Sequence, residues 1–409
     1  MSLKGAVLFG QSGGPTSVIN ASAAGVFLTA LKHEEITGVY GALHGIHGVI
    51  NDNLIDIRQE DMKELELLKY TPAAALGSVR YKLRLHKDDP TDYYKILDTF
   101  KKHNIRYFFY CGGNDSMDTC HKISKFMKEV GYECRIIGIP KTIDNDLMCI
   151  DHTPGYGSAA KFIATTISEV ILDAISYTKS RVTIIETMGR HTGWLAAASS
   201  LATINGLGPD LVYIPEIPFD VDNFIEDVAR LYRENQRVIA VVSEGIVDEN
   251  GNFVLEKSEN VEVDHFGHVH LGGVGYRLAN EVKRRLELQT RVMELNLMQR
   301  CAAHLTSKVD VDEAFTFGKK AIEQALKGVS DSMITLRRTR MNYKVEYDVI
   351  PLSEVANHER KLPREWMNER GNNVLPEFVD YALPLIKGEN RLKFEKGLPR
   401  FAKLKKIKV

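Results

Sequence analysis

The sequence lacks the cysteine pattern of a disulfide scaffold and that of a zinc site. Its 409 residues include five cysteines, an odd number, and no two of them stand in a CxxC or other metal-ligand spacing. Scattered cysteines of this kind are typical of reduced thiols in a cytosol. We therefore expect a cytoplasmic protein.

The sequence also lacks long apolar runs and an excess of charge of either sign. No stretch approaches the ~20 apolar residues that a membrane span needs, and we expect no signal peptide, because the N-terminus has no such pattern. The 53 basic residues are balanced by 54 acidic ones, which leaves a net charge of −1. Without a basic field, neither nucleic acid nor an anionic membrane is an expected partner.

The length and composition are those of a soluble globular protein with a large core. Apolar residues make up 44% of the chain and charged residues 26%, which is ordinary for such proteins. At about 150 residues per domain, the chain is long enough for two domains.

Short apolar runs alternate with helical patterns along the chain. Strands are predicted at residues 5–10, 39–42, 106–111, 135–139, 182–186 and 238–243, and helices from residue 17 and at 116–130, 158–176 and 314–326. Residues 310–313 are interpreted as the cap of the last helix. The alternation predicts an α/β fold with mostly parallel sheets and right-handed crossovers. Ligands bind such folds at the C-terminal ends of strands, which is where the polar, glycine-rich clusters of this chain occur.

Two glycine-rich turns follow predicted strands. Gly13-Gly14 lets backbone amides come close to a phosphate at a helix N-terminus. The second turn, residues 112–116 (GGNDS), adds polar side chains, and its Asp115 would repel a phosphate chain unless a metal ion or a lysine intervenes. The simpler alternative is a plain turn in which Asn114 or Asp115 caps the following helix.

Residues 140–146 (PKTIDND) are the most specific local string. In an extended stretch, residues two apart project to the same side, so Asp144 and Asp146 are predicted to face one site. One carboxylate can take a proton from an attacking hydroxyl while a neighbour helps to hold Mg²⁺. The alternative is a turn rich in Asp and Asn. Together with the glycine-rich turns, the string indicates phosphoryl transfer.

Arginines recur near the predicted strand ends, and guanidinium groups suit phosphate oxygens. These arginines are Arg80, Arg84, Arg181, Arg190, Arg291 and Arg300. Any one of them, taken alone, is more often a surface residue than a ligand-binding one. His265, His268 and His270 are too loosely spaced to predict a metal site. We interpret them as part of a loop or hairpin over residues 248–270.

In this order the strings resemble those of the 6-phosphofructokinase family, over about residues 5–330. The most specific are PKTIDND and TMGRHTGW, residues 140–146 and 187–194. The resemblance implies two Rossmann-like domains with the active site in the cleft between them. It also implies the pyrophosphate-dependent branch, because ATP-dependent members usually have glycine at the positions of Asp115 and Lys141. The implied reaction is a near-reversible transfer of phosphoryl from pyrophosphate to the 1-hydroxyl of fructose 6-phosphate.

The resemblance implies roles for individual residues. Asp144 resembles the general base, supported by Asp146, Thr142 and Arg190. Pyrophosphate would be bound by Gly14, Gly113, Asp115, Ser116, Lys141 and Arg80. Fructose 6-phosphate would be bound by Thr142, Met188, Gly189, Arg190, Glu244 and Arg300, with Arg181 and Arg291 reaching it from the neighbouring subunit of a homodimer or larger oligomer. Mg²⁺ is the implied cofactor, with Asn114, Asp115 and Asp146 as candidate ligands.

Two positions depart from the family pattern. Asn114 stands where many members have a metal-associated Asp, and a neutral amide is a weaker Mg²⁺ ligand. Leu297 stands where a His or Tyr often contacts the sugar phosphate, so that contact is expected to be lost or replaced.

The resemblance also implies a division of the chain. Residues 1–155 with about 300–350 would bind the donor, and residues 156–299 would bind fructose 6-phosphate. Residues 351–409 lie beyond the resemblance. Because they are rich in Arg, Lys, Pro and Asn, we expect a C-terminal extension of helical pieces packed on the outside, with a solvated lysine-rich end. Two alternatives remain: an ATP-dependent phosphofructokinase, and a non-catalytic paralogue that binds sugar phosphate. The second is disfavoured because Asp144, Asp146 and the arginines are all present.

Overall fold

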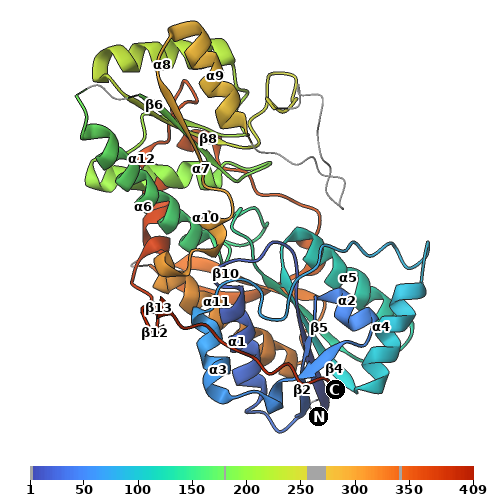
Figure 1. The fold of residues 1–409 in the computed structure, drawn as a ribbon. Coiled ribbons are helices and arrows are strands. Elements are labelled where there is room, and N and C mark those ends of the chain that lie inside the picture. Colours follow the sequence, from blue (N-terminus) through green and yellow to red (C-terminus); the bar gives the residue numbers. More distant parts are fainter. Residues whose placement is uncertain (1–2, 179–180, 256–272, 340–342) are drawn as a thin grey trace.

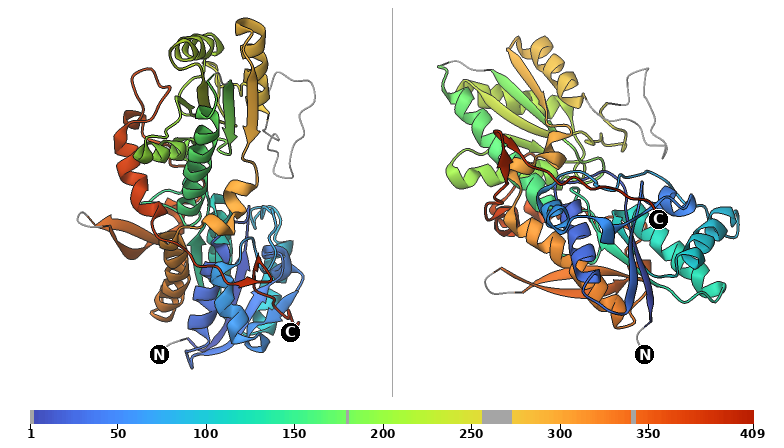
Figure 2. Two further views of the ribbon diagram at one scale, coloured as in Figure 1. Left: turned by 60° about the vertical axis from the view of Figure 1, so that its left-hand side comes forward. Right: turned by 60° about the horizontal axis from the view of Figure 1, so that its bottom comes forward.

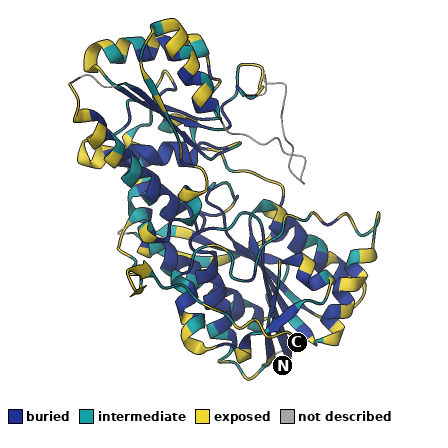
Figure 3. Cartoon of the chain, viewed as in Figure 1, coloured by how far each residue is buried: buried dark blue, intermediate teal, exposed yellow. Residues whose placement is uncertain are grey.

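The structure, a computed structural model, describes residues 3–178, 181–255, 273–339 and 343–409. It has two lobes, each built around a twisted β-sheet with helices on both faces (Figure 1). The strands are the most deeply buried parts of both lobes, and the exposed residues lie mainly on the outer helices and loops (Figure 3). The predicted α/β fold with mostly parallel sheets is confirmed.

The larger sheet has seven strands in the order β11-β10-β5-β4-β1-β2-β3. Its five central strands are parallel, and the edge strands β3 and β11 run antiparallel to their neighbours. Every residue of β1 is buried, as expected for a strand covered on both faces. The strands are β1 (Gly5–Gln11), β2 (Ile36–Ala42), β3 (Leu54–Asp56), β4 (Ile105–Gly112), β5 (Arg135–Pro140), β10 (Ser332–Thr339) and β11 (Lys344–Pro351).

Helices cover both faces of the larger sheet. α1 (Ile19–Ala30) and α11 (Lys308–Leu326) lie on one face, and α4 (Thr91–Lys102) and α5 (Asn114–Glu129) lie on the other (Figure 1). The short helices α2 (Ile46–Ile50) and α3 (Met62–Leu67) complete the lobe. α1 and α11 cross so closely that a Cβ atom at Gly25 would lie 2.0 Å from the carbonyl oxygen of Phe315. Glycine is therefore required where the backbones meet.

The smaller sheet has four parallel strands in the order β7-β8-β6-β9. They are β6 (Val182–Thr187), β7 (Leu211–Tyr213), β8 (Val238–Ser243) and β9 (Thr290–Glu294). α8 (Val221–Asn235) and α9 (Val274–Leu286) form one hydrophobic core with this sheet. α6 (Tyr156–Ile175), α7 (Trp194–Ala198) and α12 (Pro376–Ala382) form a second core with it, and the short α10 (Met298–Cys301) leads back toward the larger lobe.

The segment after β11 corrects one prediction. It contains helical pieces as expected, but they do not lie only on the outside, because Phe378, Ala382 and Leu385 are at most 1% exposed within the second core. The chain then forms a hairpin of β12 (Phe394–Glu395) and β13 (Leu398–Pro399). Its end returns along the larger lobe, where Lys408 bridges to Ile55 of β3 (Figure 2).

The lysine-rich end is solvated at its side chains but fixed at its backbone. The amides of Lys405 and Lys406 donate to the carboxylate of Glu60 at 2.6 and 2.7 Å. The amide of Lys403 donates to Glu64 at 2.6 Å. This end is therefore bound to the surface of the larger lobe.

The prediction for residues 310–313 was wrong in detail. α11 begins at Lys308 with Ser307 as its cap, so these residues lie inside the helix. Asp310 instead accepts from the amides of Gly155 and Ser158, at 2.9 Å each, and so caps α6. The predicted loop at residues 248–270, with His265, His268 and His270, falls mostly outside the described residues. No helix in the described ranges has both the length and the apolar character needed to cross a bilayer.

Candidate active site

A cleft of about 640 Å³ lies between the two lobes, at the C-terminal ends of β1, β4, β5, β6 and β8. The structure brings together in it most of the residues that the sequence predicted for the site. Those that line it are Gly14, Arg80, Gly113, Asn114, Asp115, Ser116, Lys141, Thr142, Asp144, Asp146, Met188, Arg190, Glu244 and Arg300.

The floor of the cleft is formed by the glycine-rich turns that follow β1 and β4. α5 begins at the turn that follows β4. Its N-cap is Gly113, so no side chain of the N-cap residue caps the helix. The alternative in which Asn114 or Asp115 serves only as a cap is therefore wrong. Asp115 is exposed in the first helical turn, and the Oδ1 atom of Asn114 is buried without a hydrogen-bond partner.

Lys141 follows directly on β5 and joins the two turns. Its ammonium group is buried and donates to the carbonyl oxygen of Gly14 at 2.7 Å. Burial lowers the pKa of Lys141 to about 8, although the charges of Cys111 and Asp144 oppose the shift. The turn after β1 thus carries a buried positive charge, which suits a bound phosphate.

The two carboxylates of the 140–146 string reach the cleft from a turn and not from an extended strand. Asn145 has a left-handed backbone, with φ of 55°, and its Oδ1 accepts from the amide of Thr153 at 3.0 Å. The hydroxyl of Thr142 accepts from the amide of Asp144 at 3.1 Å. Asp144 and Asp146 both line the cleft, as predicted. The prediction that they lie on an extended stretch was wrong.

The environment of this turn favours proton binding by both carboxylates. Burial raises the pKa of Asp146 to about 7, and the charges of Asp144 and Glu359 add to the effect. Burial also raises the pKa of Asp144, against the opposing effects of the Thr142 hydrogen bond and the Lys141 charge. A carboxylate with a raised pKa can accept a proton near neutral pH, as a general base must.

The loop after β6 forms the opposite wall. The amide of Met188 donates to Gln299 at 3.2 Å, and that of Gly189 donates to Glu244 at 3.4 Å. Gly189 has φ of 130° and does not itself line the cleft; it allows the tight turn that places Met188 and Arg190 there. Burial raises the pKa of Glu244 to about 7, with the charge of Asp144 adding to the rise.

Arginines separate into two groups. Arg80, Arg190 and Arg300 line the cleft, and the pKa of Arg300 is lowered by burial and by the nearby charge of Arg80. Arg181 and Arg291 lie outside the cleft of this chain. Arg291 is on β9 and pairs with Asp173 at 3.4 Å.

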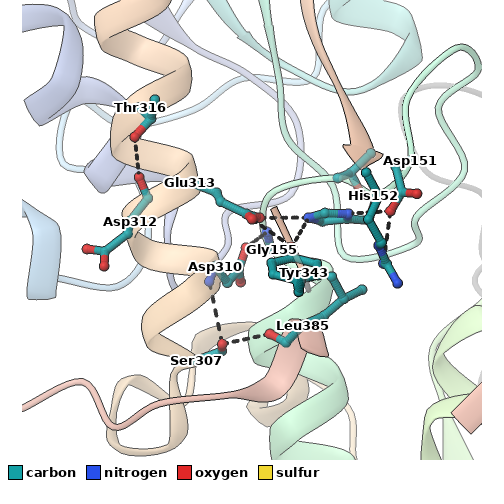
Figure 4. A network of polar contacts seen from close by, with 12 residues as sticks. Asp151, His152, Gly155, Ser307, Asp310, Asp312, Glu313, Thr316, Tyr343 and Leu385 are labelled. Carbon is teal, nitrogen blue, oxygen red and sulfur yellow. Dashed lines mark hydrogen bonds and ion pairs between the residues drawn. The ribbon is translucent and has the colours of Figure 1, made fainter. Parts of the chain in front are cut away.

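A buried polar network surrounds His152, which follows this turn in the chain (Figure 4). His152 pairs with Asp151 through Nδ1 at 2.7 Å and with Glu313 of α11 through Nε2 at 2.6 Å. The hydroxyl of Tyr343 donates to the other oxygen of Glu313 at 2.6 Å. Burial by itself lowers the pKa of His152, but the two carboxylates raise it to about 9. The network therefore joins α11 to the segment that follows the turn carrying Asp144 and Asp146.

The cleft also contains residues that the sequence analysis did not propose for the site, among them His191, Asn357 and Glu359. His191 lies within the TMGRHTGW string, so a signal for it was present. Asn357 and Glu359 come from the C-terminal extension, where no recognisable motif marks them. Glu359 pairs with His191 at 3.0 Å and so links the extension to the smaller lobe.

The cleft between parallel α/β sheets, with glycine-rich turns, cationic side chains and paired carboxylates, defines a phosphoryl-transfer site. The model of one family with this chemistry, phosphofructokinase, matches residues 6–325. The chain belongs to the phosphofructokinase family.

Several relatives resemble the chain over nearly its whole length. A pyrophosphate--fructose 6-phosphate 1-phosphotransferase of Halomonas elongata is 42% identical, covering 98% of this chain and 96% of the relative. A crystal structure of a pyrophosphate-dependent phosphofructokinase of Marinobacter aquaeolei has a TM-score of 0.89 at 40% identity, covering 100% and 97%. A sulfofructose kinase of Alkalicoccus urumqiensis is 36% identical, covering 89% and 92%.

Proposed function

We propose that the chain is a pyrophosphate-dependent 6-phosphofructokinase. It transfers a phosphoryl group from pyrophosphate to the 1-hydroxyl of fructose 6-phosphate and yields fructose 1,6-bisphosphate and phosphate. The observation that carries this proposal is that a buried Lys141 ammonium and an exposed Asp115 line the same cleft. The names of the relatives point to the same reaction.

The donor assignment follows from charge and space. Asp115 adds a negative charge where the α-phosphate of a nucleotide would lie, and so repels ATP. Lys141 supplies a compact positive charge that suits the two phosphates of pyrophosphate. Gly14, Gly113, Ser116 and Arg80 complete the donor site in this proposal.

The acceptor side is assigned to the other wall. Arg190, Arg300 and Glu244 bind the fructose 6-phosphate molecule. Met188 lies against its sugar, and Gly189 shapes the loop. Asp144 takes the proton of the attacking hydroxyl, while Thr142 orients its carboxylate by donating to it at 3.3 Å. Positioning and charge neutralisation supply most of the catalysis in such transfers.

Enzymes of this family generally use Mg²⁺, and the residues present fit that ion. The unpartnered Oδ1 of Asn114 offers an oxygen ligand, and Asp146 offers a carboxylate in the same cleft. Within the described residues, no group of three or more His, Cys, Asp or Glu side chains is arranged to hold a metal ion alone. This suits Mg²⁺, which binds through one or two carboxylates together with substrate phosphates. When bound, the ion would neutralise charge on the donor.

The proposal extends to domains and assembly. The donor-binding unit comprises residues 1–155 with about 300–350, and the sugar-binding unit comprises residues 156–299. Arg181 and Arg291 do not line the cleft of their own chain, and we assign them to the sugar phosphate of a neighbouring subunit in a homodimer or larger oligomer.

The test is identification of the products by phosphorus NMR. The purified chain is incubated with Mg²⁺, pyrophosphate and either fructose 6-phosphate or sulfofructose. We expect pyrophosphate to be replaced by equal amounts of phosphate and fructose 1,6-bisphosphate, with much slower turnover of sulfofructose. Unchanged pyrophosphate beside fructose 6-phosphate, or faster turnover of sulfofructose, would refute the assignment.

A further inference from the structure

Arg360 belongs to the C-terminal extension, beyond the residues 6–325 that the family model covers. Its backbone amide donates to the carbonyl oxygen of Asp146 at 2.7 Å. Its guanidinium group donates to the carbonyl oxygens of Asn145 at 3.0 Å, Ile150 at 2.7 Å and Asp151 at 2.5 Å. One side chain thus binds the carbonyl group between the two cleft carboxylates and two carbonyl groups further along the same segment.

These bonds matter because the segment belongs to no sheet and makes only isolated bridges to other parts of the described chain, those of Thr142 with Gly155 and of Leu147 with Glu359. Its course depends on the left-handed Asn145 and on how its carbonyl groups are satisfied. A second residue of the extension supports it: the hydroxyl of Tyr381 accepts from Asn145 Nδ2 at 2.9 Å and donates to the Asp151 carbonyl at 2.8 Å.

Arg360 is itself held in place. Its guanidinium lies over the ring of Trp194 at 4.6 Å, and the indole nitrogen of Trp194 donates to the Arg360 carbonyl at 3.1 Å. The preceding residue, Glu359, pairs with His191 in the cleft. The extension therefore lies between the catalytic turn and the 187–194 loop and contacts both.

We propose that the C-terminal extension positions the catalytic turn, with Arg360 as the main positioning residue and Tyr381 as its support. Arg360 does not line the cleft and acts through Asp144 and Asp146. A lysine cannot replace it, because one ammonium group lacks the planar fork that reaches several carbonyl groups at once. This inference rests on the proposed function, since it concerns the rate of the same reaction.

The test compares Arg360→Lys with a matched control, Arg364→Lys. Arg364 lies in the same extension and also donates to carbonyl groups, those of Met367, Asn368 and Glu369 at 3.0–3.2 Å, but none of these groups belongs to the turn. We expect Arg360→Lys to lower kcat 10- to 100-fold, with KM for both substrates within threefold of the wild type. Arg364→Lys should leave kcat within twofold. Misplacing a catalytic group by about 1 Å is enough for such a loss.

Two further measurements separate positioning from general support of the fold. Added guanidinium ion should restore part of the kcat of Arg360→Ala, and Tyr381→Phe, which keeps the ring, should lower kcat severalfold. If Arg360→Lys does not fold, the kcat of Tyr381→Phe decides whether the extension positions the turn. Wild-type kcat in a folded Arg360→Lys or in Tyr381→Phe, or equal losses in the Arg360 and Arg364 variants, would overturn the inference. An inactive wild-type protein would instead refute the proposed function.

Discussion

Lys141→Met tests the role of the buried ammonium group in donor binding. Methionine is similar in length to lysine but carries no charge, so the change removes the hydrogen bond to Gly14 and the positive charge beside the donor. A charge-assisted hydrogen bond contributes about 1.5–3 kcal/mol. We therefore expect KM for pyrophosphate to rise about 10- to 100-fold, while KM for fructose 6-phosphate changes little.

The pH dependence gives a sharper result. Burial lowers the pKa of Lys141 to about 8, so the ammonium form is lost as pH rises through that value. If only the charged form binds the donor, KM for pyrophosphate should rise about tenfold between pH 7 and pH 9 in the wild type. Lys141→Met has no ammonium group to lose, and its KM should be high throughout this range without that extra rise.

The assay is initial-rate kinetics from pH 6.5 to 9.5. At each pH, the KM of each protein for pyrophosphate is divided by the KM of a control variant. This ratio cancels the titration of pyrophosphate itself. Lys122→Met is the matched control, because Lys122 also donates to a carbonyl oxygen, that of Leu83 at 3.0 Å, but lies outside the cleft. A tenfold rise that persists in Lys141→Met would refute the reasoning, as would an unchanged KM at pH 7.

Asp144→Asn should lower kcat about 10²- to 10⁴-fold, the usual contribution of a general base, with both substrates still bound in equilibrium dialysis; a loss below tenfold would contradict its role. His152→Gln tests the network of Figure 4. The pKa of His152 is about 9, above its ordinary 6.5, so its charged form stabilises the fold fully below pH 6.5, and this contribution is lost as pH rises through 9. The contribution is about 3 kcal/mol, so in thermal melts the variant should be much less stable than the wild type at pH 6 and nearly equal to it at pH 10. A constant difference would refute this account.

The sequence was most informative where function depends on consecutive residues. Residues 140–146 and the two glycine-rich turns were predicted to lie at one site, and the structure brings them together in the cleft, because each motif is local and follows a strand. The alternation of strands and helices likewise predicted that the sheets are mostly parallel. The residues next to Asn145 did not predict the shape of the turn that carries Asp144 and Asp146. The left-handed backbone of Asn145 is stabilised by hydrogen bonds of its side chain to Thr153 and Tyr381, which lie further along the chain.

Contacts distant in sequence could not be predicted. Asp310 looked like a cap for its own helix, yet it caps α6, more than a hundred residues earlier. Glu359 reaches the cleft, and Arg360 reaches the turn beside it, because the extension packs against that turn and against His191 and Trp194. Their short segment has no motif. Such residues are placed by tertiary packing, and no local sequence pattern indicates those contacts.

A competition between donors tests the central claim most directly. Pyrophosphate and ATP at equal concentrations are mixed with fructose 6-phosphate, Mg²⁺ and the purified chain, and phosphorus NMR follows both donors in one tube. The pairing of Asp115 with Lys141 predicts that pyrophosphate is consumed and that ATP is left intact. Consumption of ATP with pyrophosphate unchanged would contradict the account.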